Sequence, residues 1–142
     1  MINKQLKEYI EKVVLPEYEK NEQGHGSRHI EYVVRRSLEF AKQVKDVNLD
    51  MVYTIASYHD IGHHIDAKNH EQVSADIFAD DENHFIFDGD INLGEIVIAL
   101  ERNRGLISVF KTNIPDGDFE TRYSLCERLV KTLLWLKGGF KI

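Results

Sequence analysis

Histidines and aspartates are concentrated in one short stretch, residues 58–70. It reads Tyr-His-Asp-Ile-Gly-His-His-Ile-Asp-Ala-Lys-Asn-His and contains four of the seven histidines of the chain, with two aspartates. Imidazole nitrogens and carboxylate oxygens are common ligands of divalent transition metals. A packed core has no need of such a cluster. The stretch therefore predicts a metal site centred on His59 and Asp60.

The ligand set needs a contribution from another part of the chain. Adjacent residues of a helix point about 100° apart, so His59 and Asp60 reach one ion only where the local geometry allows it. His29, in the first turn of an earlier predicted helix, would complete the set. A single histidine on a helix is usually a surface residue or a core residue with a satisfied ring. His84 has no partner nearby in the sequence and is not taken as a ligand.

Length and composition indicate a globular chain. With 142 residues, 42% hydrophobic and 30% charged, one domain over residues 1–142 is expected. The net charge of −6 argues against binding to nucleic acid polymers or anionic membranes, but not against a small anionic substrate held by a metal.

Two further features bear on location and on the single thiol. The apolar runs are too short to span a bilayer and the N-terminus lacks the apolar core of a signal peptide, which favours the cytoplasm. Cys126 is the only cysteine, which excludes an intrachain disulfide and is typical of a small core residue.

The hydrophobic pattern predicts an all-α fold, a single-domain bundle of about five or six helices. These helices are expected over residues 2–20, 27–45, 50–60, 69–78, 92–102 and 119–137.

Breaking and capping residues set the expected helix ends. Pro16 is expected to kink or interrupt the first helix, Ser27 and Asn69 to cap the second and fourth, and Gly62 and Gly105 to end the third and fifth. Residues 21–27 and 80–90 read as loops, and residues 106–119 as a short strand or irregular segment.

The order of these residues resembles the HD-domain superfamily of metal-dependent phosphohydrolases. The likeness lies in three segments: His25-Gly-Ser-Arg-His-Ile-Glu-Tyr-Val, then Tyr58-His-Asp-Ile-Gly-His-His-Ile-Asp, then Asn69-His-Glu-Gln-Val-Ser-Ala. It covers residues 25–79, about the central 40% of the chain. The resemblance implies a helical bundle that holds a divalent cation through His29, His59 and Asp60.

The resemblance also implies roles for neighbouring residues. Asp60, His64 and His70 would serve catalysis, and a histidine at the position of His70 binds a second ion in two-metal relatives or otherwise contacts phosphate or donates a proton. Arg28, His63 and Lys68 would contact the substrate, although a solvated surface role fits Arg28 and Lys68 equally well.

The likeness fades in the last third of the chain. Small members of the family often carry an acidic residue followed by histidine where this chain has Arg102 and Asn103, and they take a last aspartate ligand from a later helix. Residues 119–137 contain no aspartate, which leaves Asp118 or Asp116 as the substitute. Family divergence, loss of activity with retention of the fold, and an altered C-terminal third (for example, after a reading-frame change) would each explain the difference.

The expected function is hydrolysis of a small phosphorylated substrate, a nucleotide among the candidates, by a metal-activated water. The metal is open among Mn, Fe, Zn, Ni, Co and Mg. Two alternatives on the same scaffold are an inactive HD module that binds a nucleotide or a partner protein, and a di-iron oxygenase. A helical structural protein with incidental histidines is a further alternative. The oligomeric state is open, with a homodimer among the alternatives.

Overall fold

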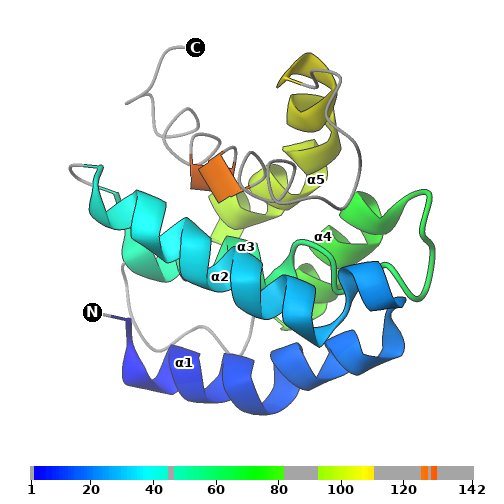
Figure 1. Ribbon diagram of the computed structural model, residues 1–142, viewed down its shortest axis with the longest axis horizontal. Helices are drawn as coiled ribbons and strands as arrows, with labels where there is room; N and C mark the ends of the chain where they lie inside the picture. The colour runs from blue at the N-terminus through cyan, green and yellow to red at the C-terminus, as the bar shows by residue number, and fades with distance from the viewer. Residues whose placement is uncertain (1, 45–46, 82–92, 111–125, 128, 131–142) are drawn as a thin grey trace.

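The described residues form helices and contain no strand. The computed structural model describes residues 2–44, 47–81, 93–110, 126–127 and 129–130. The all-α prediction is thus confirmed for this part of the chain (Figure 1). Among the same residues, no helix is both long enough and apolar enough to cross a membrane.

The described part of the chain contains α-helices that follow one another in sequence order. Their bounds are α1 Lys4–Tyr9, α2 Ser27–Lys42, α3 Leu49–Tyr58, α4 His70–Asp81 and α5 Leu93–Phe110. Between α1 and α2 lie a π-helical turn, η1 (Ile10–Val14), and two 3-10 segments, η2 (Leu15–Lys20) and η3 (Gln23–His25).

The first predicted helix, residues 2–20, is one helical run whose type changes along its length. It begins at Lys4, where the side chain of Asn3 accepts a hydrogen bond from the amide of Leu6 at 3.0 Å. Pro16 lies in the first turn of η2. Because proline has no N–H, it cannot donate to the carbonyl four residues earlier, and a regular α-helix cannot continue through it. The run continues around Pro16 as the 3-10 helix η2, which is wound more tightly, and it ends at Lys20.

Several predicted helix ends were wrong. Gly26, not Ser27, is the N-cap of α2, and it makes no side-chain cap hydrogen bond. α3 ends at Tyr58, so His59 and Asp60 lie just beyond the helix rather than on it, and Gly62 does not end it. Gly105 does not end α5 either, because a glycine inside a helix costs only about 1 kcal/mol relative to alanine.

Residues 106–110, which were predicted as part of a short strand or irregular segment, belong to α5, because this helix extends to Phe110. The prediction was wrong for these residues. Within the predicted loop of residues 21–27, Gln23–His25 form the short helix η3. The loop expected over 80–90 lies outside the described residues beyond Asp81, as does most of the helix expected over 119–137. In that last segment Cys126, Leu129 and Val130 are buried, so the prediction that Cys126 is a core residue is confirmed.

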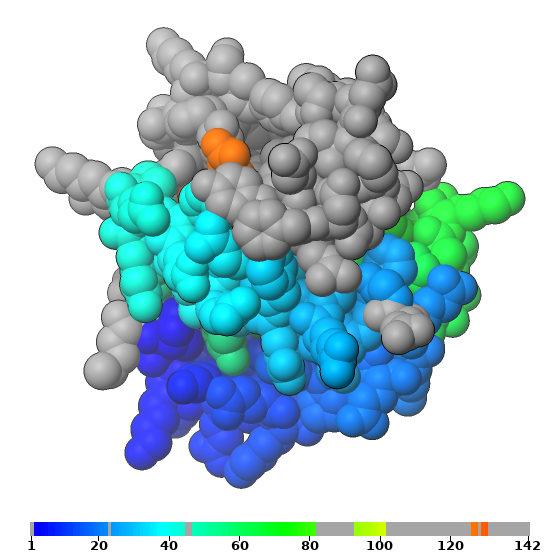
Figure 2. All heavy atoms as spheres, viewed as in Figure 1, coloured from blue at the N-terminus to red at the C-terminus, as the bar shows by residue number. Residues whose placement is uncertain are grey.

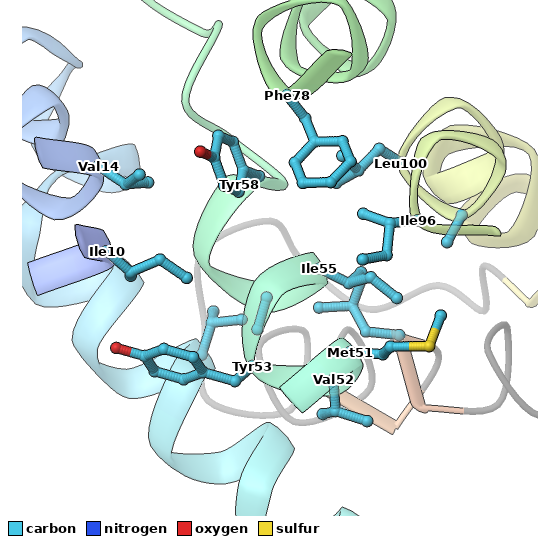
Figure 3. Packing of buried hydrophobic residues seen from close by; sticks show 14 of the residues in the cluster. Ile10, Val14, Met51, Val52, Tyr53, Ile55, Tyr58, Phe78, Ile96 and Leu100 are labelled. Carbon is cyan, nitrogen blue, oxygen red and sulfur yellow. The ribbon is translucent and has the colours of Figure 1, made fainter. Parts of the chain in front are cut away.

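α3 is the central element of the core. Every residue from Met51 to Tyr58 is buried, because α3 contacts α2, α4, α5 and η1. Figure 3 shows Ile10 and Val14 packing from one side of α3, and Phe78, Ile96 and Leu100 from the other. A helix enclosed on all sides has little freedom to shift, so its C-terminal end is a rigid base for His59.

The residues after α3 form a series of tight turns that pack against α4. The amide of Gly62 donates to Ser74 Oγ at 3.0 Å, and the turn is buried at Ile61 and Gly62. The N-terminal run, residues 4–20, and α2 cover the opposite side of these turns. Figure 2 shows the run and α2 as adjacent layers, with α4 at the edge of the view. The ends of α2, α3 and α4 thereby meet on one side of the molecule (Figure 1).

We predict that Gly62→Ala lowers the free energy of unfolding by about 1–3 kcal/mol, the usual cost of overpacking. A Cβ atom at this position would lie 2.6 Å from Val73 Cγ1 and 2.9 Å from the backbone nitrogen of Ser74. Gly24→Ala is the matched control, since a Cβ there meets nothing within 4 Å. Denaturant unfolding of both variants tests this, and equal midpoints would contradict it.

Candidate metal centre

The buried carboxylate of Asp60 is the centre of the histidine cluster. Its Oδ2 atom lies 3.0 Å from His25 Nδ1, 3.1 Å from His29 Nε2 and 3.5 Å from His59 Nε2. Its Oδ1 atom lies 3.1 Å from His70 Nε2. Asp60 is only 4% exposed. Four imidazoles therefore converge on the two oxygens of one carboxylate.

Each of these rings comes from a helix end. His25 ends η3, His29 lies in the first turn of α2, His59 is the C-cap of α3 and His70 begins α4. His25 and His29 lie on either side of Gly26, the extended N-cap of α2, and their ring centroids are 5.7 Å apart. The cluster therefore contains residues from four segments, which together span 46 positions of the sequence, from His25 to His70.

The three residues predicted as ligands have the separations that one cation requires. His29 Nε2, His59 Nε2 and Asp60 Oδ2 form a triangle with sides of 3.1, 3.3 and 3.5 Å. Metal–ligand bonds of about 2.1 Å place neighbouring ligand atoms about 3.0 Å apart in an octahedron and about 3.4 Å apart in a tetrahedron. The donor atoms of His25, His29 and Asp60 also lie within 4.8 Å of one another, close enough to share an ion.

Backbone contacts orient two of the rings. His59 Nδ1 lies 2.6 Å from the carbonyl oxygen of Ala56, and His70 Nδ1 lies 3.0 Å from that of Ala67. A carbonyl oxygen only accepts, so Nδ1 is the protonated nitrogen in each ring. In neutral His59 the Nε2 lone pair then lies on the side of Asp60, as a metal ligand requires. His29 Nδ1 is buried and has no hydrogen-bond partner among the described residues, and the contacts of this ring with His59 and Asp60 are made through Nε2.

The local electrostatics keep Asp60 ionised. Burial by itself raises the pKa of Asp60, but the charge of His59 and hydrogen bonds from His25, His29 and His59 hold it well below its usual range. Burial, together with the charges of His59 and His25, lowers the pKa of His29 despite the hydrogen bond and charge of Asp60. Burial also lowers the pKa of His70, yet the hydrogen bond and charge of Asp60 raise it to about 9. An anionic carboxylate beside a neutral His29 is the protonation pattern that suits cation binding.

One side of the cluster is accessible to solvent. The side chain of His25 is 38% exposed and that of His70 is 18% exposed, against 1% for His59. The ring of His63 stacks on that of His25 with centroids 3.8 Å apart. Burial, followed by the charge of His25, lowers the pKa of His63. The rings of His25, His63 and His70 therefore form a polar mouth over a buried set of donor atoms.

Two residues of the site were not predicted as ligands from the sequence. His25 was read only as part of a motif, because it lies in a segment predicted as a loop, where no helical spacing signals a ligand. Glu71 is 7% exposed, and its Oε1 lies 3.2 Å from His70 Nε2. A glutamate beside a candidate ligand at the start of a helix is too common to single out from sequence alone. Glu71 supplies a second carboxylate next to the one of Asp60.

Of the remaining predicted residues, His64, Arg28 and Lys68 are described and are exposed. The backbone amide and Nδ1 of His64 contact Asn21 Oδ1 at 2.9 and 3.0 Å, and the ring is exposed. His64 lines a separate groove of about 320 Å³ that also contains Val13 and Ile65. Asp116, Asp118 and His84 lie outside the described residues.

No protein-family model matches the chain, and neither a curated protein nor a solved structure does. The resemblance to the HD-domain superfamily stays a prediction. The case for a metal centre therefore depends on the donor atoms described above.

We predict that His59→Ala weakens the binding of a divalent ion such as Co²⁺ at least about 100-fold, because it removes a buried donor whose lone pair faces Asp60. Met51→Ala is the control, since Met51 is buried in α3, the helix that ends just before His59, and its loss costs stability without changing any donor atom. Titration calorimetry on folded, metal-stripped protein provides the measurement. Stoichiometric Co²⁺ binding of unchanged affinity in His59→Ala would refute the assignment.

Proposed function

We propose that this protein is a divalent-metal-dependent phosphohydrolase that acts on a small phosphorylated substrate. The observation that carries the proposal is the triangle of His29 Nε2, His59 Nε2 and Asp60 Oδ2, with sides of 3.1–3.5 Å. These are the three residues that match the ligand motif of the resembling family.

The chemistry of the donor set fits a divalent cation. His29, His59 and Asp60 would hold it, with His25 as a further donor on the open side. Imidazole and carboxylate together accept several first-row metals, so the identity of the ion stays open. When bound, such an ion neutralises phosphate charge and lowers the pKa of water.

The residues around the donors suit an anionic substrate. The N-terminal ends of α2 and α4 both lie at the cluster, and helix N-termini favour negative charge. His63 and His25 present stacked rings at the mouth, with N–H groups that donate to phosphate oxygens. His70, whose pKa is raised to about 9 by Asp60, carries a proton at neutral pH for a leaving oxygen. A nucleotide is one candidate for this substrate.

A second candidate is an inactive module of the same type that binds a phosphorylated ligand. It is favoured by Arg102 and Asn103, which stand where small relatives often carry an acidic residue and a histidine. On this alternative the donor set still binds a metal, but no phosphoester is hydrolysed.

We expect phosphate release from at least one member of a panel of nucleotides and sugar phosphates when metal-stripped protein is reloaded with Mn²⁺, Co²⁺ or Zn²⁺. Asp60→Asn should lower that rate at least about 100-fold, because it removes the anionic donor that all four imidazoles face. Asp76→Asn is the matched control, since Asp76 is exposed on α4 and bonds only Gln72 among the contacts described here.

The outcomes separate the two candidates. Metal-dependent turnover that Asp60→Asn abolishes and Asp76→Asn retains supports the hydrolase. Stoichiometric metal binding with no turnover on any phosphoester supports the inactive module. Turnover that survives in Asp60→Asn would overturn the proposed site.

A further inference from the structure

The amide and the carbonyl of Asp60 are both bound by side chains from residues 18–21, at the end of the N-terminal run. The amide of Asp60 donates to Tyr18 Oη at 3.2 Å, and its carbonyl oxygen accepts from Asn21 Nδ2 at 2.9 Å. Tyr18 is fully buried, and its hydroxyl also donates to the carbonyl oxygen of Ser57 at 2.6 Å. The peptide groups on either side of the Asp60 Cα atom are thus bound by residues about 40 positions away.

The amide of Asn21 uses all of its hydrogen-bonding capacity at this point. Its Nδ2 atom donates to the carbonyl oxygens of Asp60 and His25, both at 2.9 Å. Its Oδ1 atom accepts from the backbone amide of His64 at 2.9 Å and from His64 Nδ1 at 3.0 Å. One side chain therefore joins the turn after α3 to the segment that carries His25.

These contacts lie where regular structure ends. α3 stops at Tyr58, and the turn that follows is held internally by short-range hydrogen bonds such as Ile61 N to Tyr58 O and His63 N to Asp60 O. Such turns do not fix the direction of a side chain as a helix does. The position of the Asp60 carboxylate relative to the four imidazoles must depend on contacts from outside the turn.

We infer that Tyr18 and Asn21 are positioning residues that set the orientation of Asp60 and its distance from His25, and thereby the geometry of the donor set. Neither side chain contacts the Asp60 carboxylate, so each acts through the backbone. The meaning of this role for catalysis rests on the proposed function. Supporting contacts of this kind commonly change metal affinity by 10- to 100-fold when they are removed.

The test uses Tyr18→Phe and Asn21→Ala with a matched control for each. Tyr53→Phe removes a hydroxyl from another buried tyrosine, and Asn3→Ala removes the N-cap of α1; neither Tyr53 nor Asn3 has a described contact with Asp60. Co²⁺ binding by calorimetry and the visible absorption spectrum of the Co²⁺-loaded protein are measured for all four variants. The spectrum reports ligand geometry, which a loss of stability alone does not change.

We expect about 10-fold or greater weakening of Co²⁺ binding and an altered spectrum in Tyr18→Phe and Asn21→Ala, with both control variants within about twofold of the parent protein. Affinity and spectrum unchanged in both test variants would overturn the inference. So would equal losses in the test and control variants.

A second measurement separates this inference from the proposed function. In metal-free protein, hydrogen exchange of the Asp60 amide should be at least about 10-fold faster in Tyr18→Phe than in Tyr53→Phe, because Tyr18 Oη is its acceptor. If the parent protein binds no Co²⁺ but this difference is found, the metal proposal fails and the positioning role stands. Equal exchange rates would overturn the positioning role.

Discussion

The site depends on a single buried anion, the carboxylate of Asp60. Taking an ionised carboxylate out of water has a large cost unless partners with positive charge or hydrogen-bond donors surround it. Here imidazoles supply those contacts, and the charge of His59 with hydrogen bonds from His25, His29 and His59 keeps the pKa of Asp60 low despite its burial. In neutral imidazoles that lose these hydrogen bonds, the same nitrogen atoms carry lone pairs, and a cation bound between them would take the place of the shared protons.

This constraint accounts for how the helices are arranged. α3 is enclosed by its neighbours, so the backbone that leads to His59 cannot move. α2 and α4 begin at the site, which brings His29 and His70 onto either side of the carboxylate. At the end of the N-terminal run, Tyr18 and Asn21 bind the backbone of Asp60, in the turn that follows α3. The helical bundle is therefore organised around the end of α3, where regular structure stops and the histidine cluster lies.

Local sequence signals predicted part of this arrangement and could not predict the rest. The helices followed from hydrophobic spacing, which is written in neighbouring residues, whereas the grouping of His29, His59 and Asp60 was expected from the resemblance. The end of α3 was misplaced by two residues since no glycine or proline marks it. Asn21 was read as a loop residue, because its function depends on partners about 40 positions away. Long-range hydrogen bonds of this kind leave no periodic trace in a sequence.

Anomalous diffraction from crystals loaded with Co²⁺, recorded at the cobalt absorption edge, tests the central claim most directly. The account predicts one strong peak about 2.1 Å from His29 Nε2, His59 Nε2 and Asp60 Oδ2, the distance at which a first-row ion binds such donors. A peak of that strength elsewhere, with none between these three atoms, would contradict it. So would a site in which ordered water alone fills the space between the three donors at saturating Co²⁺.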